Sequence, residues 1–151
     1  MGWLVLFFAA WLLALTMVPI KEWKRLWPAG VVGLATIYVI DSTLIGLGAF
    51  SYSLGNPVLT GLPTFYLLSS FAGAVLLAYH CPKQGWWQIL FVMLMAAAFL
   101  LIEVVMFKLG YFHYLLWSPA SSYILNIGGF IVVLWLAQKA NAVGKGTDIG
   151  K

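Results

Sequence analysis

Five long apolar runs dominate the hydrophobic pattern of this chain, at residues 2–20, 28–47, 59–79, 86–109 and 120–137. Each run is continuously apolar, whereas the strands of a membrane barrel alternate between apolar and polar residues. Each is also close to the roughly 20 residues that a helix needs to cross about 30 Å of hydrocarbon. The second run starts at Pro28, a residue favoured at the first position of a helix. The pattern predicts an all-α membrane protein with five transmembrane helices.

Composition strengthens this prediction and excludes a soluble domain. The chain has 151 residues, of which 64% are hydrophobic and 8% charged, whereas soluble domains carry about 25% charged residues. So few charges cannot cover a soluble globule, and we therefore expect the lipid bilayer to surround most of the surface. The net charge of +4 comes from short clusters between the runs, and there is no nucleic-acid-binding motif. No metal-site spacing and no cofactor motif occurs, and the single Cys81 excludes an internal disulfide.

The basic residues between the runs predict the orientation of the helices. They follow the first, third and fifth runs, whereas the segments after the second and fourth runs have only Lys108 at an edge. In a five-span topology all of these clusters lie on one side, and Lys and Arg are enriched on the cytoplasmic side. We therefore expect the N-terminus outside and the C-terminus inside, with residues 139–151 as a loosely ordered cytoplasmic tail. The basic residues concerned are Lys21, Lys24, Arg25, Lys83, Lys139 and Lys145.

A pattern of an acid, a glycine, alternating aromatic residues and a proline occurs twice in the chain. It covers residues 40–57 and again residues 102–119, with a constant offset of 62 and no gap. We infer an internal duplication, with 21–80 as repeat one and 83–138 as repeat two of a single transmembrane domain at 1–138. Because each repeat holds two helices, both keep the same orientation about an axis along the membrane normal, and the first helix packs outside the pair. The matched residues are Asp41 with Glu103, Gly48 with Gly110, Phe50 with Phe112, Tyr52 with Tyr114, and Pro57 with Pro119.

Asp41 and Glu103 are the strongest candidates for functional residues. A charged side chain inside a membrane helix costs about 2.5–3.5 kcal/mol on insertion scales, so such residues usually face the interior of a bundle. Both acids lie in the half of their helix nearer the outer loops. If the repeat axis passes between their helices, the two carboxylates face each other and tend to share a proton, which suits a proton relay, a cation site or general acid–base chemistry. The alternative is a structural role, in which each acid accepts a hydrogen bond from a hydroxyl or a loop amide and holds the loop.

Lys108 and His113 lie on the same outer side as Glu103, and repeat one has Gly46 and Ser51 in their places. Lys108 can serve as a counter-ion for one carboxylate, or its side chain can simply reach the aqueous interface. His113 can carry protons near neutral pH, or it can be a solvated loop residue.

The aromatic residues of the two loops also have two interpretations. They match the aromatic belt expected at a membrane interface, or they fold back into the mouth of the bundle and line a pocket. At the outer ends of the return helices, Thr60 aligns with Ser122 and Thr64 with Asn126, at a depth similar to that of the acids. The predicted ligand site consists of Asp41, Glu103, Lys108, His113, Tyr52, Tyr114, Thr64 and Asn126.

Three parts of the chain resemble a known family: the segment at 21–30 (KEWKRLWPAG), the helix with Asp41, and residues 103–114 together with Trp117. They resemble a family of small, uncharacterised multi-spanning membrane proteins of spore-forming bacteria. The similarity covers most of residues 20–138 and implies a multi-pass protein of the bacterial cytoplasmic (inner) membrane, without implying a reaction. More distantly, intramembrane acids on repeated helices are similar to the lycopene cyclase domain of carotenoid synthesis. That family's Pro-x-Glu-Glu signature is missing, because Glu103 has neither the proline nor the second acid.

We expect the protein to hold a small cation, a proton or a lipid-like ligand at the acidic site, in the outer half of the membrane. The first alternative is a membrane enzyme that acts on an isoprenoid-like apolar substrate, which requires a lipid-open pocket beside an acid. The second alternative is a structural or assembly subunit of a membrane complex, which requires an apolar groove on the exterior. A chain of 151 residues is small for an autonomous transporter, so we also expect a homo-oligomer or a partner membrane subunit.

Overall fold

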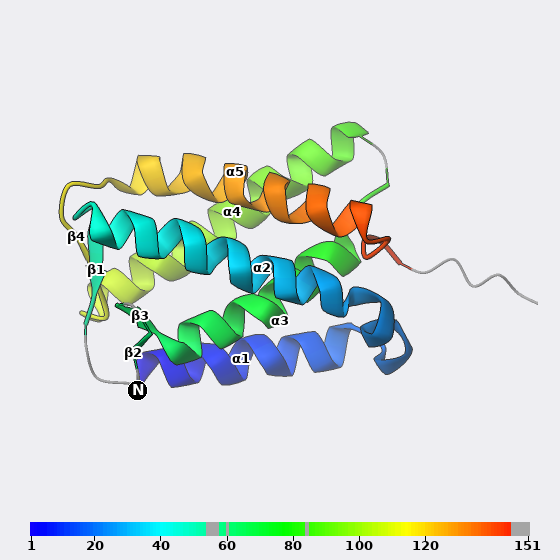
Figure 1. Cartoon of the computed structure of the whole chain (residues 1–151), viewed down its shortest axis with the longest axis horizontal. Coiled ribbons are helices and arrows are strands. Elements are labelled where there is room, and N and C mark those ends of the chain that lie inside the picture. Colours follow the sequence, from blue (N-terminus) through cyan, green and yellow to red (C-terminus); the bar gives the residue numbers. More distant parts are fainter. Residues whose placement is uncertain (54–57, 60, 84, 146–151) are drawn as a thin grey trace, which may run out of the picture.

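The computed structural model describes residues 1–53, 58–59, 61–83 and 85–145. In these residues, five helices run alongside one another and alternate in direction (Figure 1), which confirms the prediction of an all-helical fold. The helices are α1 (Gly2–Met17), α2 (Ile20–Gly46), α3 (Thr64–His80), α4 (Gly85–Lys108) and α5 (Pro119–Lys139). Four short strands are β1 (Phe50–Tyr52), β2 (Val58–Leu59), β3 (Leu62–Pro63) and β4 (Phe112–Tyr114). The predicted residues Pro57 and Thr60 lie outside the described residues.

Three of the helices, α2, α4 and α5, are long and apolar enough to cross a membrane. The helices α1 and α3 are apolar but shorter, with 16 and 17 residues, which correspond to about 24 and 26 Å at about 1.5 Å per residue. The first ends early because Val18 precedes a proline and is extended, with φ −108° and ψ 117°. The second starts late because Leu62–Pro63 pairs with Val58–Leu59 as a small ribbon. The expected spans 2–20 and 59–79 were therefore too long, whereas α4 and α5 match their predicted ends within two residues.

The start of α2 also differs from the prediction, because Pro28 lies inside this helix and not at its first position. Proline removes one hydrogen bond from a helix interior, at a cost of about 3 kcal/mol. Packing of the first two turns offsets this loss. Leu26 is fully buried in a cluster with Val18 and Val75, and the Trp23 ring stacks on a ring of α1. The basic segment predicted as a loop is therefore helical.

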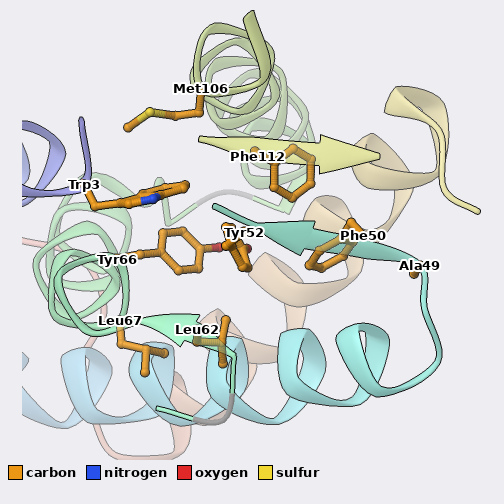
Figure 2. Close-up of a cluster of buried hydrophobic side chains, with 9 residues drawn as sticks. All are labelled: Trp3, Ala49, Phe50, Tyr52, Leu62, Tyr66, Leu67, Met106 and Phe112. Atoms are coloured by element: carbon orange, nitrogen blue, oxygen red, sulfur yellow. The ribbon is translucent and has the colours of Figure 1, made fainter. Parts of the chain in front are cut away.

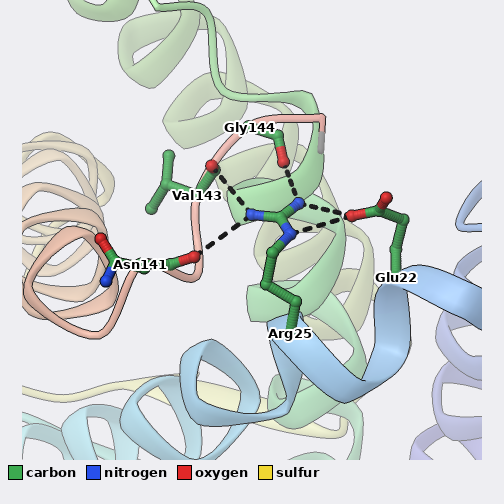
Figure 3. A network of polar contacts seen from close by, with 5 residues as sticks. All are labelled: Glu22, Arg25, Asn141, Val143 and Gly144. Carbon is green, nitrogen blue, oxygen red and sulfur yellow. Dashed lines mark hydrogen bonds and ion pairs between the residues drawn. The ribbon is translucent and has the colours of Figure 1, made fainter. Parts of the chain in front are cut away.

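The segments that carry the basic residues used to predict the orientation lie together at one end of the bundle, which we call the basic end (Figure 1). Lys108, at the last position of α4, lies at the opposite end. At the basic end, the Arg25 guanidinium forms an ion pair with Glu22, with 2.6 Å between Nη2 and Oε2. It also donates to the carbonyl oxygens of Asn141, Val143 and Gly144 (Figure 3). The Gly144 amide donates to the Ala78 carbonyl of α3 at 2.8 Å. Residues 140–145 are thus docked on the bundle, contrary to the expectation of a loosely ordered tail from residue 139 onwards.

The four strands lie at the opposite end, which we call the strand end (Figure 1). β1 and β4 pair as antiparallel strands, with Phe50 opposite Tyr114, Ser51 opposite His113 and Tyr52 opposite Phe112. β1 follows a glycine turn after α2, and β4 follows a glycine turn after α4.

The turns that lead from α2 into β1 and from α4 into β4 have the same geometry. Gly48 and Gly110 have φ values of +72° and +77°, a left-handed conformation that favours glycine. Their amides donate to the carbonyls of Ile45 and Phe107, three residues earlier, and the following amides donate to carbonyls five residues earlier. These are the paired hydrogen bonds of a Schellman helix end. Both turns redirect the chain across the end of the bundle.

The strand end contains the largest buried aromatic cluster, shown in Figure 2. Phe50, Tyr52 and Phe112 are between 3% and 8% exposed. Of the two interpretations of the loop aromatics, a fold back into the bundle mouth is therefore correct for these three side chains. The full set is Trp3, Ala49, Phe50, Tyr52, Leu62, Tyr66, Leu67, Met106 and Phe112.

Candidate functional site

Asp41 lies on α2, little more than one turn before the helix ends, and its side chain is buried at 7% exposure. Its Oδ2 atom accepts two hydrogen bonds from phenol groups, from Tyr52 Oη at 2.9 Å and from Tyr66 Oη at 3.0 Å. β1 supplies the first tyrosine and the first turn of α3 supplies the second. The acid is therefore held by neutral donors from two elements that follow its own helix.

Glu103 occupies the corresponding place on α4 and is held in a similar way. Its Oε1 atom accepts from Tyr114 Oη at 2.8 Å and from Ser122 Oγ at 2.6 Å. The serine oxygen in turn accepts from Trp117 Nε1 at 3.1 Å, so its proton is directed at the acid. The second acid thus also receives one tyrosine from a strand and one hydroxyl from the first turn of the next helix.

In both cases the strand tyrosine lies 11 residues after its acid. Burial and the nearby Asp41 carboxylate raise the pKa of the Tyr52 phenol well above its usual value. Burial and the hydrogen bond to Glu103 likewise raise the pKa of Tyr114. Both phenols therefore keep their protons at physiological pH and act as donors to the acids.

Asp41 and Glu103 line the same cavity, which has a volume of about 40 Å³. Among the described residues neither acid forms an ion pair. A water molecule needs roughly 10–15 Å³ of such space, whereas pockets for larger organic ligands measure about 300–1,000 Å³. The cavity therefore suits water, a proton or a small ion. The other lining residues are Trp3, Leu6, Phe50, Tyr52, Tyr66, Phe99, Ile102, Met106, Phe112, Ser122, Leu125 and Asn126.

Five of the eight predicted site residues come together around this cavity. Asp41, Glu103, Tyr52 and Asn126 line it, and Tyr114 bonds to Glu103 from outside the lining.

The other three predicted residues lie elsewhere. Lys108 is exposed at the last position of α4, and His113 is exposed on the β1–β4 ribbon, where its Nε2 atom is 2.8 Å from Ser53 Oγ. Thr64 begins α3 and does not line the cavity. The geometry thus separates Lys108 and His113 from the acids.

Sequence reasoning did not include Trp3 or Tyr66 in the site, and it named Ser122 as a partner for the acids without placing it in the predicted set. Ser122 had a signal, because it follows the second loop at the start of a return helix. Tyr66 is one aromatic residue in an apolar run, and Trp3 belongs to the helix that was expected to pack outside the repeats. In the structure, α1 packs on α3 and brings Trp3 into the cavity wall. α1 is therefore part of the site.

Among the described residues, no group of three or more His, Cys, Asp or Glu side chains is placed to hold a metal ion. Comparison with protein families, with curated proteins and with solved structures found no match to this chain. The resemblance to the spore-former membrane family stays a prediction.

Proposed function

We propose that this is a multi-pass protein of the bacterial cytoplasmic membrane that binds a proton or a small monovalent cation between Asp41 and Glu103. The observation that carries the proposal is the arrangement of two acids from different helices around one small cavity. Only neutral groups among the described residues donate to them. Asp41 is buried and Glu103 is half-buried. A buried negative charge without a cationic partner is costly, so uptake of one positive charge would lower the free energy of the pair.

The proposed topology places the strand end outside and the basic end in the cytoplasm. The clustering of basic segments at one end supports this orientation, because Lys and Arg are enriched on the cytoplasmic side of membrane proteins. The acids lie near the strand end and would then sit in the outer half of the bilayer, within reach of the extracytoplasmic water.

A duplicated hairpin is part of the proposal. Three features separated by 62 residues support it: the glycine turns at Gly48 and Gly110, the acids at Asp41 and Glu103, and the tyrosines that bond to them. The β1–β4 register also supports it, because the pairing is symmetric about the Ser51–His113 pair. A pseudo-two-fold axis there would relate the two acids and place the ligand between them.

The size of the cavity separates the proposal from the alternative enzyme. An isoprenoid-like substrate requires a lipid-open pocket many times larger than the observed volume of about 40 Å³. A lipid-like ligand is also too large for this cavity, whereas a proton or a small ion fits.

Thermal unfolding of the purified protein in detergent tests the proposal. A proton held by the folded pair is released on unfolding, so stability should fall as pH rises; a bound Na⁺ or K⁺ should raise Tm relative to choline. Asp41→Asn and Glu103→Gln should each remove the dependence. Glu22→Gln is the matched control, because it removes an acid at the basic end and should keep the dependence even if Tm falls. Unchanged pH and cation dependence in both cavity variants, with native circular dichroism, would rule the proposal out.

A further inference from the structure

The hydrogen bonds of the two acids are unevenly distributed between their oxygen atoms. Both phenols bond to Oδ2 of Asp41, and both hydroxyls bond to Oε1 of Glu103. The described residues supply no hydrogen bond to Oδ1 of Asp41 or Oε2 of Glu103. Each acid therefore has one oxygen with spare acceptor capacity beside the cavity.

Two N–H donors in the cavity wall lack a hydrogen-bond acceptor within the described part of the chain. Trp3 Nε1 and Asn126 Nδ2 are buried and have no hydrogen-bond partner among the described residues. Trp3 is only 3% exposed, and Figure 2 shows its indole over the rings of Tyr52 and Tyr66. The Asn126 amide is near the Glu103 carboxyl but does not complete a hydrogen bond with it. Buried donors without partners are rare in native proteins, and each requires an explanation.

Building on the proposed function, we propose that the ligand is a proton held through water between Asp41 and Glu103, and that the site excludes Na⁺ and K⁺. A water molecule has two acceptor sites and two protons. It can accept from Trp3 Nε1 and Asn126 Nδ2 and donate to the two spare carboxylate oxygens. The cavity has room for at least one such molecule. When both spare oxygens are unprotonated, all four unmatched groups find a partner.

The same two donors disfavour an alkali cation. Hard cations are bound by oxygen ligands, whereas in the proposed arrangement two N–H groups would direct their positive ends into the space that such an ion needs. A water molecule uses those groups as donors, and so does not meet this repulsion. The site therefore selects a proton carried by water.

Transfer across the pair is balanced and needs no other reactant. The protonated carboxyl replaces one of the two N–H donors at the water oxygen and gives its proton to that oxygen, while the water gives one of its own protons to the opposite carboxylate. One O–H bond breaks and one forms at the water, and the net charge of the pair stays at −1. The titratable groups that face the acids are Tyr52 from β1, Tyr66 from α3 and Tyr114 from β4. α1 and α5 contribute Trp3, Ser122 and Asn126, which do not titrate.

Infrared spectroscopy of the full-length protein in detergent tests the inference. The protonated carboxyl band is titrated with pH in Na⁺, K⁺ or choline at constant ionic strength, and bound water is identified by its shift in ¹⁸O-labelled water. We expect a titration midpoint that does not depend on the cation, and a labelled water band that disappears in Trp3→Phe and in Asn126→Leu. Trp87→Phe is the matched control, because its indole is 55% exposed and does not line the cavity.

The outcomes distinguish failure of the proposed function, of the selectivity for a proton and of the water bridge. If the carboxyl band is insensitive to both Asp41→Asn and Glu103→Gln, the proposed function fails. If the acids titrate but a tenfold rise in Na⁺ or K⁺ moves the midpoint by about one pH unit, as competition for one site requires, the site binds a cation and the inference is overturned. If the water band survives in Trp3→Phe and Asn126→Leu, the bridge is overturned, and the Trp3 N–H instead faces the ring of Tyr52 or Tyr66, whose centroids lie 5.2 and 5.3 Å away.

Discussion

The two ends of the helical bundle accommodate charge in opposite ways. At the basic end, Arg25 is neutralised by Glu22 and by three carbonyl groups of the segment after α5 (Figure 3). At the strand end, Asp41 and Glu103 receive hydrogen bonds only from neutral groups among the described residues, and both face a cavity. A charge whose partners are all supplied by the chain has a structural role. A buried charge with neutral partners and adjacent space keeps its capacity for a ligand.

Loss of both phenol donors to Asp41 is expected to have the largest effect on stability at the strand end. Each hydrogen bond to a charged group contributes about 1.5–3 kcal/mol, so Tyr52→Phe combined with Tyr66→Phe should lower the unfolding free energy by about 3–6 kcal/mol when the acid is ionised. The loss should shrink at low pH, because a protonated carboxyl needs fewer donors. Chemical denaturation in detergent at several pH values measures both quantities. An equal loss at every pH would mean that the phenols contribute packing only.

At the basic end, Arg25→Met should lower the unfolding free energy by about 2–3 kcal/mol, because it leaves Glu22 and three carbonyl groups without their donor. Arg25→Lys should recover only part of this loss, since an ammonium group cannot reproduce the guanidinium fork. Denaturation and the rate of proteolysis between residues 140 and 145 are the measurements. The proton titration of the cavity should stay unchanged, and a shift there would show that the two ends are coupled.

The glycine turns allow a matched test of the strand end. Gly48→Ala and Gly110→Ala should each destabilise the protein by about 1–2 kcal/mol, because a side chain disfavours the left-handed conformation. An added Cβ meets no atom within 4 Å at either position, so the cost is conformational. Gly46→Ala, which is helical and equally open, should instead stabilise by about 0.5–1 kcal/mol. Clearly unequal losses at positions 48 and 110 would weaken the proposed duplication.

The smallest effects are expected at Lys108 and His113, which are exposed and lie away from the cavity. Lys108→Gln and His113→Gln should change the unfolding free energy by no more than about 0.5 kcal/mol. They should also leave the pH dependence of Tm intact. If either variant abolishes this dependence, the residue takes part in proton binding and the boundary of the site must be redrawn.

The misses at the helix ends have a common physical cause. The apolar runs 2–20 and 59–79 continue beyond α1 and α3 because hydrophobicity does not distinguish a helix from buried extended chain. Pro28 was expected to begin α2, but burial of Leu26 extends the helix back to Ile20. In both cases packing against another segment outweighed a local preference.

The sequence by itself determined that this is a helical membrane protein and where α4 and α5 lie. It also located the two acids on candidate membrane-spanning helices and the tyrosines 11 residues beyond them. These features are visible in sequence because apolar runs, helix-ending glycines and charges within spans are local patterns. Only the tertiary structure decided that Tyr66 donates to Asp41, that Trp3 of α1 closes the cavity, and that Lys108 stays outside it. Those contacts join segments distant in the chain, and they depend on how the helices rotate against one another, which no local pattern specifies.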